Sequence, residues 1–235
     1  RKINVITQAK IKSIKKSKGI ATVSVEGFDP IKADKVLMAV GVTGNINKIG
    51  INKLNIATDR GFICTNEYMQ TNVDNVYAIG DVSGPPLLAH VASFEGVLAV
   101  EHISGKDVEP MRYDNVPACT YCEPEIASVG LTEKQAKDQG YDIKVGMFPF
   151  SALGKALAEG NREGFVKIIY DKQYGELLGC HIIGNNATNL ISEVAIARKL
   201  ETTYHEVLKT IHPHPTLSEA IQESTAQAFN EAIHL

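Results

Sequence analysis

The sequence predicts an α+β chain in which an antiparallel sheet packs against helices, preceded by partial α/β segments. Short β-branched runs alternate with turns over residues 3–40, and three strand-like runs follow one another over 143–183. Three segments with helical apolar spacing then complete the chain from residue 190 onward. Strands followed by a run of helices are typical of α+β architecture. A chain of 235 residues, 44% hydrophobic, has room for one or two domains.

The first 110 residues contain several strand patterns and one strong helix pattern. Residues 20–25 alternate with a period of two after Lys18-Gly19, which predicts a hairpin. Residues 35–40 predict a buried strand ending at Gly41. Apolar spacing predicts a helix over 89–104 that stops at Gly105. Further strands are predicted at 1–6, 10–18, 62–65 and 76–79.

A second pattern begins near Met111. Residues 125–131 predict a strand, and Thr132 with Gln135 forms a capping box that opens a short helix closed by Gly140. Strands are predicted at 143–150, 164–170 and 176–183, and the last two form a hairpin. Three helices with apolar stripes follow, around 190–200, 207–211 and 221–229.

Charge and hydropathy exclude two classes of partner. The net charge is -3, and no long Lys/Arg run is available to neutralise phosphates, so we expect no nucleic-acid binding. No apolar run approaches the ~18 residues of a membrane span, so we expect no membrane partner. Four cysteines are too few for a disulfide scaffold and suit a reducing compartment. The chain opens on Arg1 rather than Met, so we expect it to be part of a longer protein whose targeting cannot be read.

A first candidate site lies where the predicted strand 76–79 ends in Gly80-Asp81. Gly80 permits close approach of a ligand to the backbone, and Asp81 stands at the carboxyl end of the strand, where α/β sheets bind ligands. The following helix start near Ala89 offers free N–H groups. On Gly-Asp alone, a simple strand-ending turn with a capping acid is the stronger interpretation.

A second candidate site is the run His212-Pro213-His214-Pro215-Thr216-Leu217-Ser218-Glu219. The two prolines restrict the backbone on both sides of His214, and Glu219 is close enough in sequence to reach back to it. A carboxylate on one ring nitrogen would make the other a general base. Thr216 to Glu219 is also a capping box, so Glu219 has a purely structural alternative, and the two roles are compatible.

The extended strings around both sites resemble the flavoprotein disulfide reductases. Residues 71–81 are similar to the second flavin-binding motif of that family, and residues 212–220 to its C-terminal active-site motif. Leu87-Leu88-Ala89-His90, Glu95-Gly96 and the double-histidine form most resemble the members that oxidise dihydrolipoamide. The resemblance implies that Asp81 bonds the ribityl chain of FAD and that Leu87, Leu88, Ala89 and His90 lie along the flavin. It implies that His214 is the acid–base and Glu219 its partner, with His212 a lesser neighbour.

The same resemblance implies an organisation and a set of partners. Residues 1–45 would be the last strands of an NAD domain, 46–110 a flavin-contacting segment, and 111–235 the interface domain of a homodimer. FAD would be the cofactor and NAD the co-substrate, with Gly41 touching the nicotinamide nucleotide, although Val42 and Thr43 stand where the family commonly has Arg. The expected partner is the lipoyl domain of a 2-oxo-acid dehydrogenase or glycine-cleavage complex, in the bacterial cytoplasm or mitochondrial matrix.

Several family motifs are absent from these 235 residues. No GxGxxG occurs, and no cysteine pair has the CxxxxC spacing of the family's redox disulfide, so we expect the isolated chain to be inactive. Cys119 and Cys122 form a lone CxxC, which favours structural cysteines over zinc or redox chemistry. Cys64 and Cys180 lie in strand-like runs and are expected to be buried.

Two alternatives to a dihydrolipoamide-oxidising enzyme stay open. The parent protein could be another disulfide reductase or a soluble transhydrogenase, which share the fold. The end of the chain argues against mercuric reductase and large thioredoxin reductases, because no cysteine follows Cys180. The chain could also act as a non-catalytic dimerisation module. Flavin content and oligomeric state discriminate between these functions.

Overall fold

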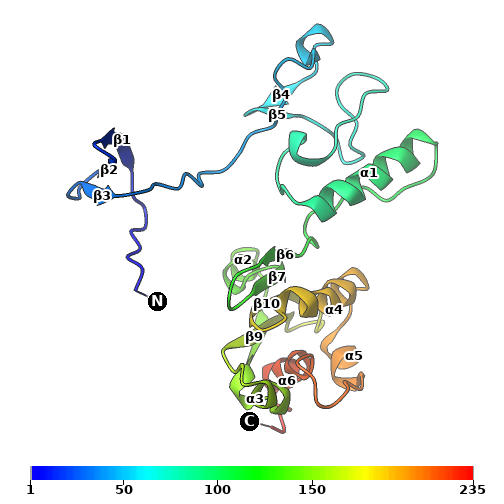
Figure 1. Cartoon of the computed structure of the whole chain (residues 1–235). Coiled ribbons are helices and arrows are strands. Elements are labelled where there is room, and N and C mark those ends of the chain that lie inside the picture. Colours follow the sequence, from blue (N-terminus) through cyan, green and yellow to red (C-terminus); the bar gives the residue numbers. More distant parts are fainter. Residues whose placement is uncertain (1, 235) are drawn as a thin grey trace. The chain divides into compact units, whose positions relative to one another are not determined.

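A computed structural model describes residues 2–234. The chain divides into two compact units, with the boundary in the sequence between Thr43 and Gly44. The first unit contains a three-stranded antiparallel sheet in the order β1-β2-β3 (Figure 1). Its strands are β1 (Ile11–Ser17), β2 (Ile20–Val25) and β3 (Ile31–Ala33). The predicted hairpin is confirmed, and Lys18 and Gly19 at its turn both have positive φ.

Two predicted strands of this first unit are wrong. Residues 2–6 and 35–40 carry no strand assignment, and Arg1 of the first predicted strand lies outside the described residues. The side chains of the second run are exposed, with Leu37 at 90% and Val40 at 79% of full exposure. A strand needs a hydrogen-bonded neighbour, and none of the described residues supplies one to this run. Its apolar character therefore marks a segment suited to burial in a sheet that these residues do not form.

The second unit begins with short elements and one long helix. These are a 3₁₀ turn (Ile51–Lys53), the strand pair β4 (Thr58–Asp59) and β5 (Phe62–Ile63), a 3₁₀ turn (Gly80–Val82) and α1 (Ala89–Ile103). The helix is confirmed and ends before Gly105, whose φ is +79°. The predicted strand 76–79 is wrong, since only an isolated bridge joins Tyr77 to Gln70. The buried cluster of this part is small and consists of Met69, Leu98 and Ala99.

The remainder of this unit is built on a five-stranded antiparallel sheet in the order β6-β7-β10-β9-β8, which confirms the predicted α+β architecture. The strands are β6 (Ala118–Thr120), β7 (Ile126–Gly130), β8 (Ile143–Pro149), β9 (Gly164–Asp171) and β10 (Leu177–Gly184). The β9-β10 hairpin forms as predicted. One register row runs from Val129 through Cys180 and Ile168 to Gly146.

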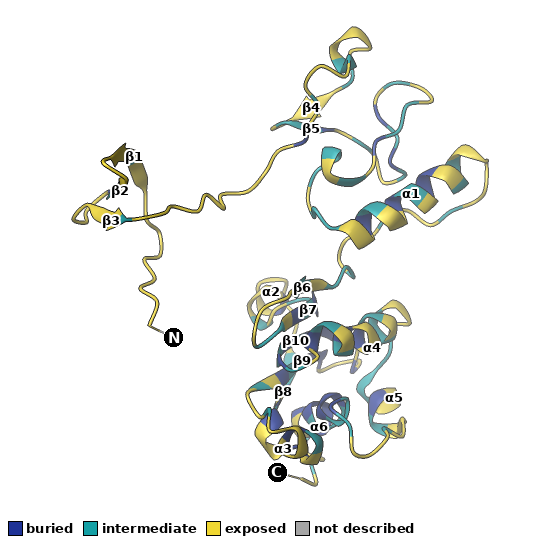
Figure 2. Cartoon of the chain, in the orientation of Figure 1, coloured by how far each residue is buried: buried dark blue, intermediate teal, exposed yellow. Residues whose placement is uncertain are grey.

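Helices cover both faces of this sheet (Figure 2). They are α2 (Glu133–Asp138), α3 (Gly154–Glu159), α4 (Ala187–Lys199), α5 (Tyr204–Lys209) and α6 (Glu219–Ala228). Side chains of α4 and α6 share the main core with Val166, Ile168 and Cys180 of the strands. Ala136 of α2 packs with Ile169 in a second core, as the alternating faces of a strand require. The capping box of Thr132 and Gln135 is confirmed.

The helix α6 lies directly on the backbone of β8. A Cβ atom on Gly146 would overlap the carbonyl of Ser224, so only glycine permits this approach. The Ser224 hydroxyl donates to the carbonyl of Val166 on β9 at 3.0 Å. The Tyr170 and Thr225 hydroxyls are 2.9 Å apart between sheet and helix. These contacts fix the position of α6, whose first residue, Glu219, belongs to a predicted site.

Candidate functional site

The structure brings His214 and Glu219 together at the start of α6. The Nδ1 atom of His214 lies 2.8 Å from Oε1 of Glu219. The imidazole is 75% exposed, whereas the Glu219 side chain is 21% exposed. An ionised carboxylate accepts only, so Nδ1 carries the proton and donates, which leaves Nε2 as the basic nitrogen. This arrangement presents an imidazole base to whatever approaches the exposed edge of the ring.

The two interpretations of Glu219 are both present in its geometry. Its second oxygen, Oε2, accepts a hydrogen bond from the backbone N–H of Thr216 at 2.8 Å, which is one half of the predicted capping box. The Thr216 hydroxyl donates instead to the carbonyl of Pro213 at 2.7 Å, so the other half is missing. Burial alone raises the pKa of Glu219, but the Thr216 N–H and His214 hold that pKa below its usual value. Glu219 is thereby kept as the charged acceptor that His214 needs.

His212 has a carboxylate partner that the sequence did not indicate. Its Nε2 atom lies 2.8 Å from Oε1 of Glu193 on α4. The side chain of His212 is only 4% exposed. Glu193 stands 19 residues earlier in the chain, and no local spacing rule connects residues so far apart. Among the described residues, two histidine–glutamate pairs therefore flank Pro213.

The turn at Gly80-Asp81 is held by a buried carboxylate. Oε2 of Glu95 on α1 accepts the N–H of Gly80 at 2.7 Å, and Oε1 accepts the Tyr113 hydroxyl at 2.7 Å. Glu95 is 2% exposed, while Asp81 faces solvent. Burial, followed by the bond to Glu95, raises the pKa of Tyr113. The Glu95-Gly96 string pointed to a resemblance, but the sequence alone assigned Glu95 no role in supporting this turn.

The four residues expected along a flavin surround the beginning of α1. Leu87 and Leu88 are half-buried, and Ala89 and His90 are exposed. Leu88 is the N-cap residue and offers no side-chain acceptor, so no side chain caps the first turn of the helix. Nε2 of His90 donates to the carbonyl of Pro117 at 3.0 Å, which ties the helix to the segment that leads into β6.

The other predicted positions lie apart from these clusters. Gly41 belongs to the first unit, where its φ is +99° and a Cβ atom would meet nothing within 4 Å. Cys180 is buried as expected, but Cys64 is exposed, so that prediction is wrong: β5 ends at Ile63, one residue before it. In the CxxC, Cys119 lies on β6 and the Cys122 thiol is 2.9 Å from the carbonyl of Pro124.

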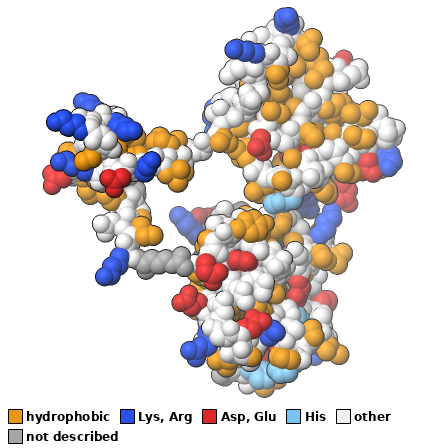
Figure 3. All heavy atoms as spheres, viewed as in Figure 1, with side chains coloured by type: hydrophobic (Ala, Val, Ile, Leu, Met, Phe, Trp, Pro, Cys, Tyr) orange, Lys and Arg blue, Asp and Glu red, His pale blue; other side chains and the backbone are white. Residues whose placement is uncertain are grey.

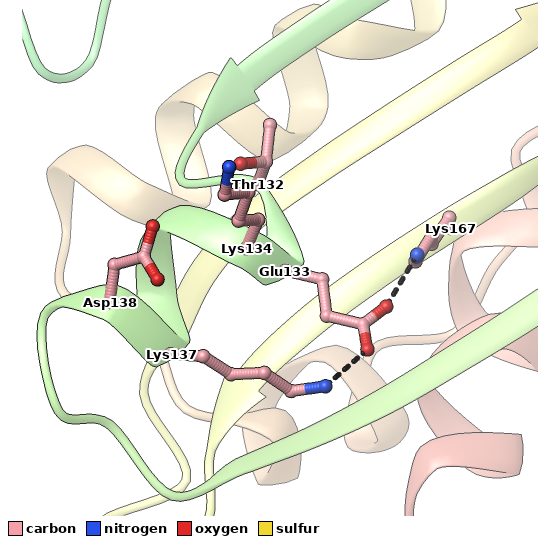
Figure 4. A pocket seen from close by; sticks show the side chains of 6 residues that line it. All are labelled: Thr132, Glu133, Lys134, Lys137, Asp138 and Lys167. Carbon is pink, nitrogen blue, oxygen red and sulfur yellow. Dashed lines mark hydrogen bonds and ion pairs between the residues drawn. The ribbon is translucent and has the colours of Figure 1, made fainter.

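A surface hollow beside α2 offers no comparable chemistry. Glu133 bonds both Lys137 and Lys167, at 2.7 and 2.6 Å (Figure 4). The two lysines lower the pKa of Glu133 to about 2. Glu133 is thus already paired with two lysines, so its carboxylate is not free to act as an acid or a base in this hollow.

Residues 2–234 contain neither a metal-binding cluster nor a membrane-spanning helix. No group of three or more His, Cys, Asp or Glu residues is placed to hold a metal ion within that range. None of the helices in that range is both long and apolar enough to cross a bilayer. In the face that Figure 3 presents, acidic and basic side chains are mixed over the second unit, and basic side chains gather on β1–β3.

Two protein-family models match the chain, and both describe the same family. Residues 116–225 match the dimerisation domain of the pyridine nucleotide-disulphide oxidoreductases, and residues 1–96 match the pyridine nucleotide-disulphide oxidoreductase model. Both candidate sites lie within these matched ranges.

Curated relatives match all or most of the chain. A dihydrolipoyl dehydrogenase of Zymomonas mobilis is 46% identical over 239 residues, covering 100% of this chain and 51% of the relative. A dihydrolipoyl dehydrogenase of Bacillus subtilis is 50% identical over 202 residues, covering 86% of this chain and 43% of the relative. The chain thus spans about half the length of the curated relatives it matches.

Solved structures agree with these matches. A crystal structure of LpdA from Mycobacterium tuberculosis has a TM-score of 0.86 at 28% identity, over 92% of this chain and 48% of that one. The HOCl-induced flavoprotein disulfide reductase RclA from Escherichia coli has a TM-score of 0.85 at 23% identity, over 93% and 50% of the two chains. The second likeness concerns the fold alone.

Proposed function

The chain belongs to the pyridine nucleotide-disulphide oxidoreductases, and from that premise we propose that it is the C-terminal half of a dihydrolipoyl dehydrogenase. The intact enzyme would oxidise dihydrolipoamide to lipoamide and reduce NAD. The observation that carries the proposal is the exposed His214 imidazole whose Nδ1 is fixed by Glu219 at 2.8 Å. Relatives named dihydrolipoyl dehydrogenase, at 46% and 50% identity, supply the substrate class.

The proposed role of His214 is to take a proton from a thiol of the substrate. Glu219 keeps the Nδ1–H tautomer, so Nε2 of this exposed ring carries a free lone pair. Proton transfer to Nε2 converts the thiol to a thiolate, which is the nucleophilic form in disulfide exchange. The imidazolium that forms is then stabilised by the Glu219 carboxylate, as in other His–carboxylate pairs.

The segment around Asp81 fits a bound FAD. The exposed Asp81 carboxylate offers acceptors for sugar-like hydroxyls, and the uncapped first turn of α1 offers N–H groups and a positive dipole end. Gly80 has a φ of +71°, and a Cβ atom there would come within 3.2 Å of Ala92. When bound, FAD carries the electrons from the dithiol to NAD. Leu87 to His90 are the proposed flavin-facing residues.

The proposed partners follow from the same premise. A second copy of the protein would pair through the region that matches the dimerisation domain. The substrate would arrive on the lipoyl domain of a 2-oxo-acid dehydrogenase or glycine-cleavage complex, in the bacterial cytoplasm or the mitochondrial matrix. Gly41 is the proposed contact to the nicotinamide nucleotide.

Substitution of His214 in the intact protein tests this function. His214→Gln should lower dihydrolipoamide turnover by roughly 10²- to 10⁴-fold, the usual contribution of a general base. His205→Gln is the matched control, because His205 is an exposed histidine on α5 that stacks on Tyr204. Unchanged turnover in His214→Gln would exclude the assignment. Dimers with neither flavin nor turnover in the unsubstituted protein would favour the dimerisation-module alternative.

A further inference from the structure

His212 is the more enclosed of the two histidines in the loop between α5 and α6. Its side chain is 4% exposed, against 75% for His214. Glu193 of α4 lies on one side of its ring, and the carbonyl of Thr210 lies on the other. Only Pro213 separates the two histidines, and its ring fixes φ near -65°. Pro213 therefore removes one backbone torsion between the two histidines.

Both ring nitrogens of His212 face acceptors. Nδ1 lies 3.2 Å from the carbonyl oxygen of Thr210, and Nε2 lies 2.8 Å from Oε1 of Glu193. A backbone carbonyl never donates, so Nδ1 must carry a proton. The Glu193 side chain is 41% exposed, and a carboxylate accepts hydrogen bonds but donates none. Nε2 must then carry a proton as well, and the species that satisfies both bonds is the imidazolium.

The charged surroundings favour this cation. Glu193 on α4, the Thr210 carbonyl of its own loop and Glu219 on α6 each raise the pKa of His212, while burial opposes them. Glu193 is the largest influence, and the net pKa of His212 is raised. Gln222 of α6 also donates to the Thr210 carbonyl at 3.2 Å, so the same oxygen holds the loop from two sides.

We propose that His212 is a doubly protonated clamp that ties this loop to α4 and thereby acts as a positioning residue for His214 and Glu219. The inference rests on the proposed acid–base role of that pair. His212 itself touches no reacting atom. Its charge holds Thr210 and Glu193 at fixed places, and the rigid Pro213 carries that placement to the His214 ring.

The clamp has a defined pH dependence. The folded-state pKa of His212 is raised, so its contribution is complete below the unfolded value of ~6.5 and is lost as pH rises through the folded value. Loss of one ring proton breaks one of the two bonds. The loop should then hold the His214–Glu219 pair less tightly in alkaline solution.

Nuclear magnetic resonance on the chain labelled with ¹⁵N-histidine tests the proposal. We expect both His212 nitrogens to be protonated at pH 7, and Glu193→Gln to lower the midpoint of the His212 titration by about one pH unit. In His212→Gln, the share of His214 in the Nδ1–H tautomer should fall. The control His205→Gln should change neither signal, because His205 lies on α5 outside the clamp.

Three outcomes would overturn the clamp. These are a single protonated nitrogen on His212 at pH 7, a midpoint unmoved by Glu193→Gln, or a His214 tautomer unmoved by His212→Gln. If His212→Gln fails to fold, Glu193→Gln decides the matter alone, since Glu193 is partly exposed. These signals are read without turnover. Unchanged turnover in His214→Gln would therefore exclude the proposed function without affecting the evidence for the clamp.

Discussion

Glu95 offers the sharpest test of how the Gly80-Asp81 turn is supported. Its two oxygens accept from the Gly80 N–H and the Tyr113 hydroxyl, both at 2.7 Å, within a side chain that is 2% exposed. Glu95→Ala leaves both donors without this acceptor. Because Gly80 is half-buried and Tyr113 is 42% exposed, each donor left unsatisfied costs near the lower end of ~1–3 kcal/mol, or about 2 kcal/mol for the two together. Glu95→Gln should cost only ~1 kcal/mol, because its amide retains one acceptor and can donate to the Tyr113 oxygen.

Hydrogen exchange of the α1 amides measures this loss locally. A cost of ~2 kcal/mol or more should make these amides exchange at least ~30-fold faster in Glu95→Ala. Glu101→Ala is the matched control on the same helix, where an exposed pair with Lys106 at 3.0 Å is worth at most ~1 kcal/mol, or about fivefold. Exchange in Glu95→Ala within fivefold of the unsubstituted chain would refute the reasoning.

Two further predictions concern the five-stranded sheet and its surface. Gly146→Ala should destabilise the chain by ~1–3 kcal/mol or more in urea unfolding, because the added Cβ atom would overlap the Ser224 carbonyl. Gly154→Ala is the control: its Cβ atom would meet nothing within 4 Å, so the substitution should be neutral or stabilising. An equal effect of the two substitutions would contradict the packing of α6 on β8. The Glu133 pKa is lowered to about 2, so its contribution is present above the unfolded value of ~4.3 and is lost as pH falls toward 2. After allowance for screening, the difference in unfolding free energy from Glu133→Gln should be ~0.5–1 kcal/mol at pH 7 and vanish near pH 2, and a difference independent of pH would disprove the pairing.

The sequence predicted those elements whose signals are local. The hairpin at Lys18-Gly19, the helix that stops at Gly105 and the capping box at Thr132 each depend on a few neighbouring residues, and each forms. The run 35–40 has a strand's composition but finds no hydrogen-bonding neighbour among the described residues. A propensity for β structure becomes a strand only when a partner is available.

In the candidate sites too, contacts between residues close in sequence could be predicted, and contacts between distant residues could not. Glu219 lies five residues after His214, and the geometry that this spacing allows is present. Glu193 is brought to His212 by the packing of α4, and Tyr113 is brought to Glu95 by the segment before β6. Such partners depend on tertiary contacts, for which the linear spacing of residues gives no rule. The proposed roles of Asp81 and Gly41 remain predictions.

The most direct test of the proposed function is the reductive half-reaction of the intact protein, followed by stopped-flow absorbance of its flavin. With His214→Gln, reduction by dihydrolipoamide should be slower by roughly 10²- to 10⁴-fold, since the thiol must lose its proton to a base. Reduction of the same variant by NADH should proceed at the unsubstituted rate, because no thiol is involved. Equal rates with dihydrolipoamide in the two proteins would contradict the assignment of His214 as the acid–base.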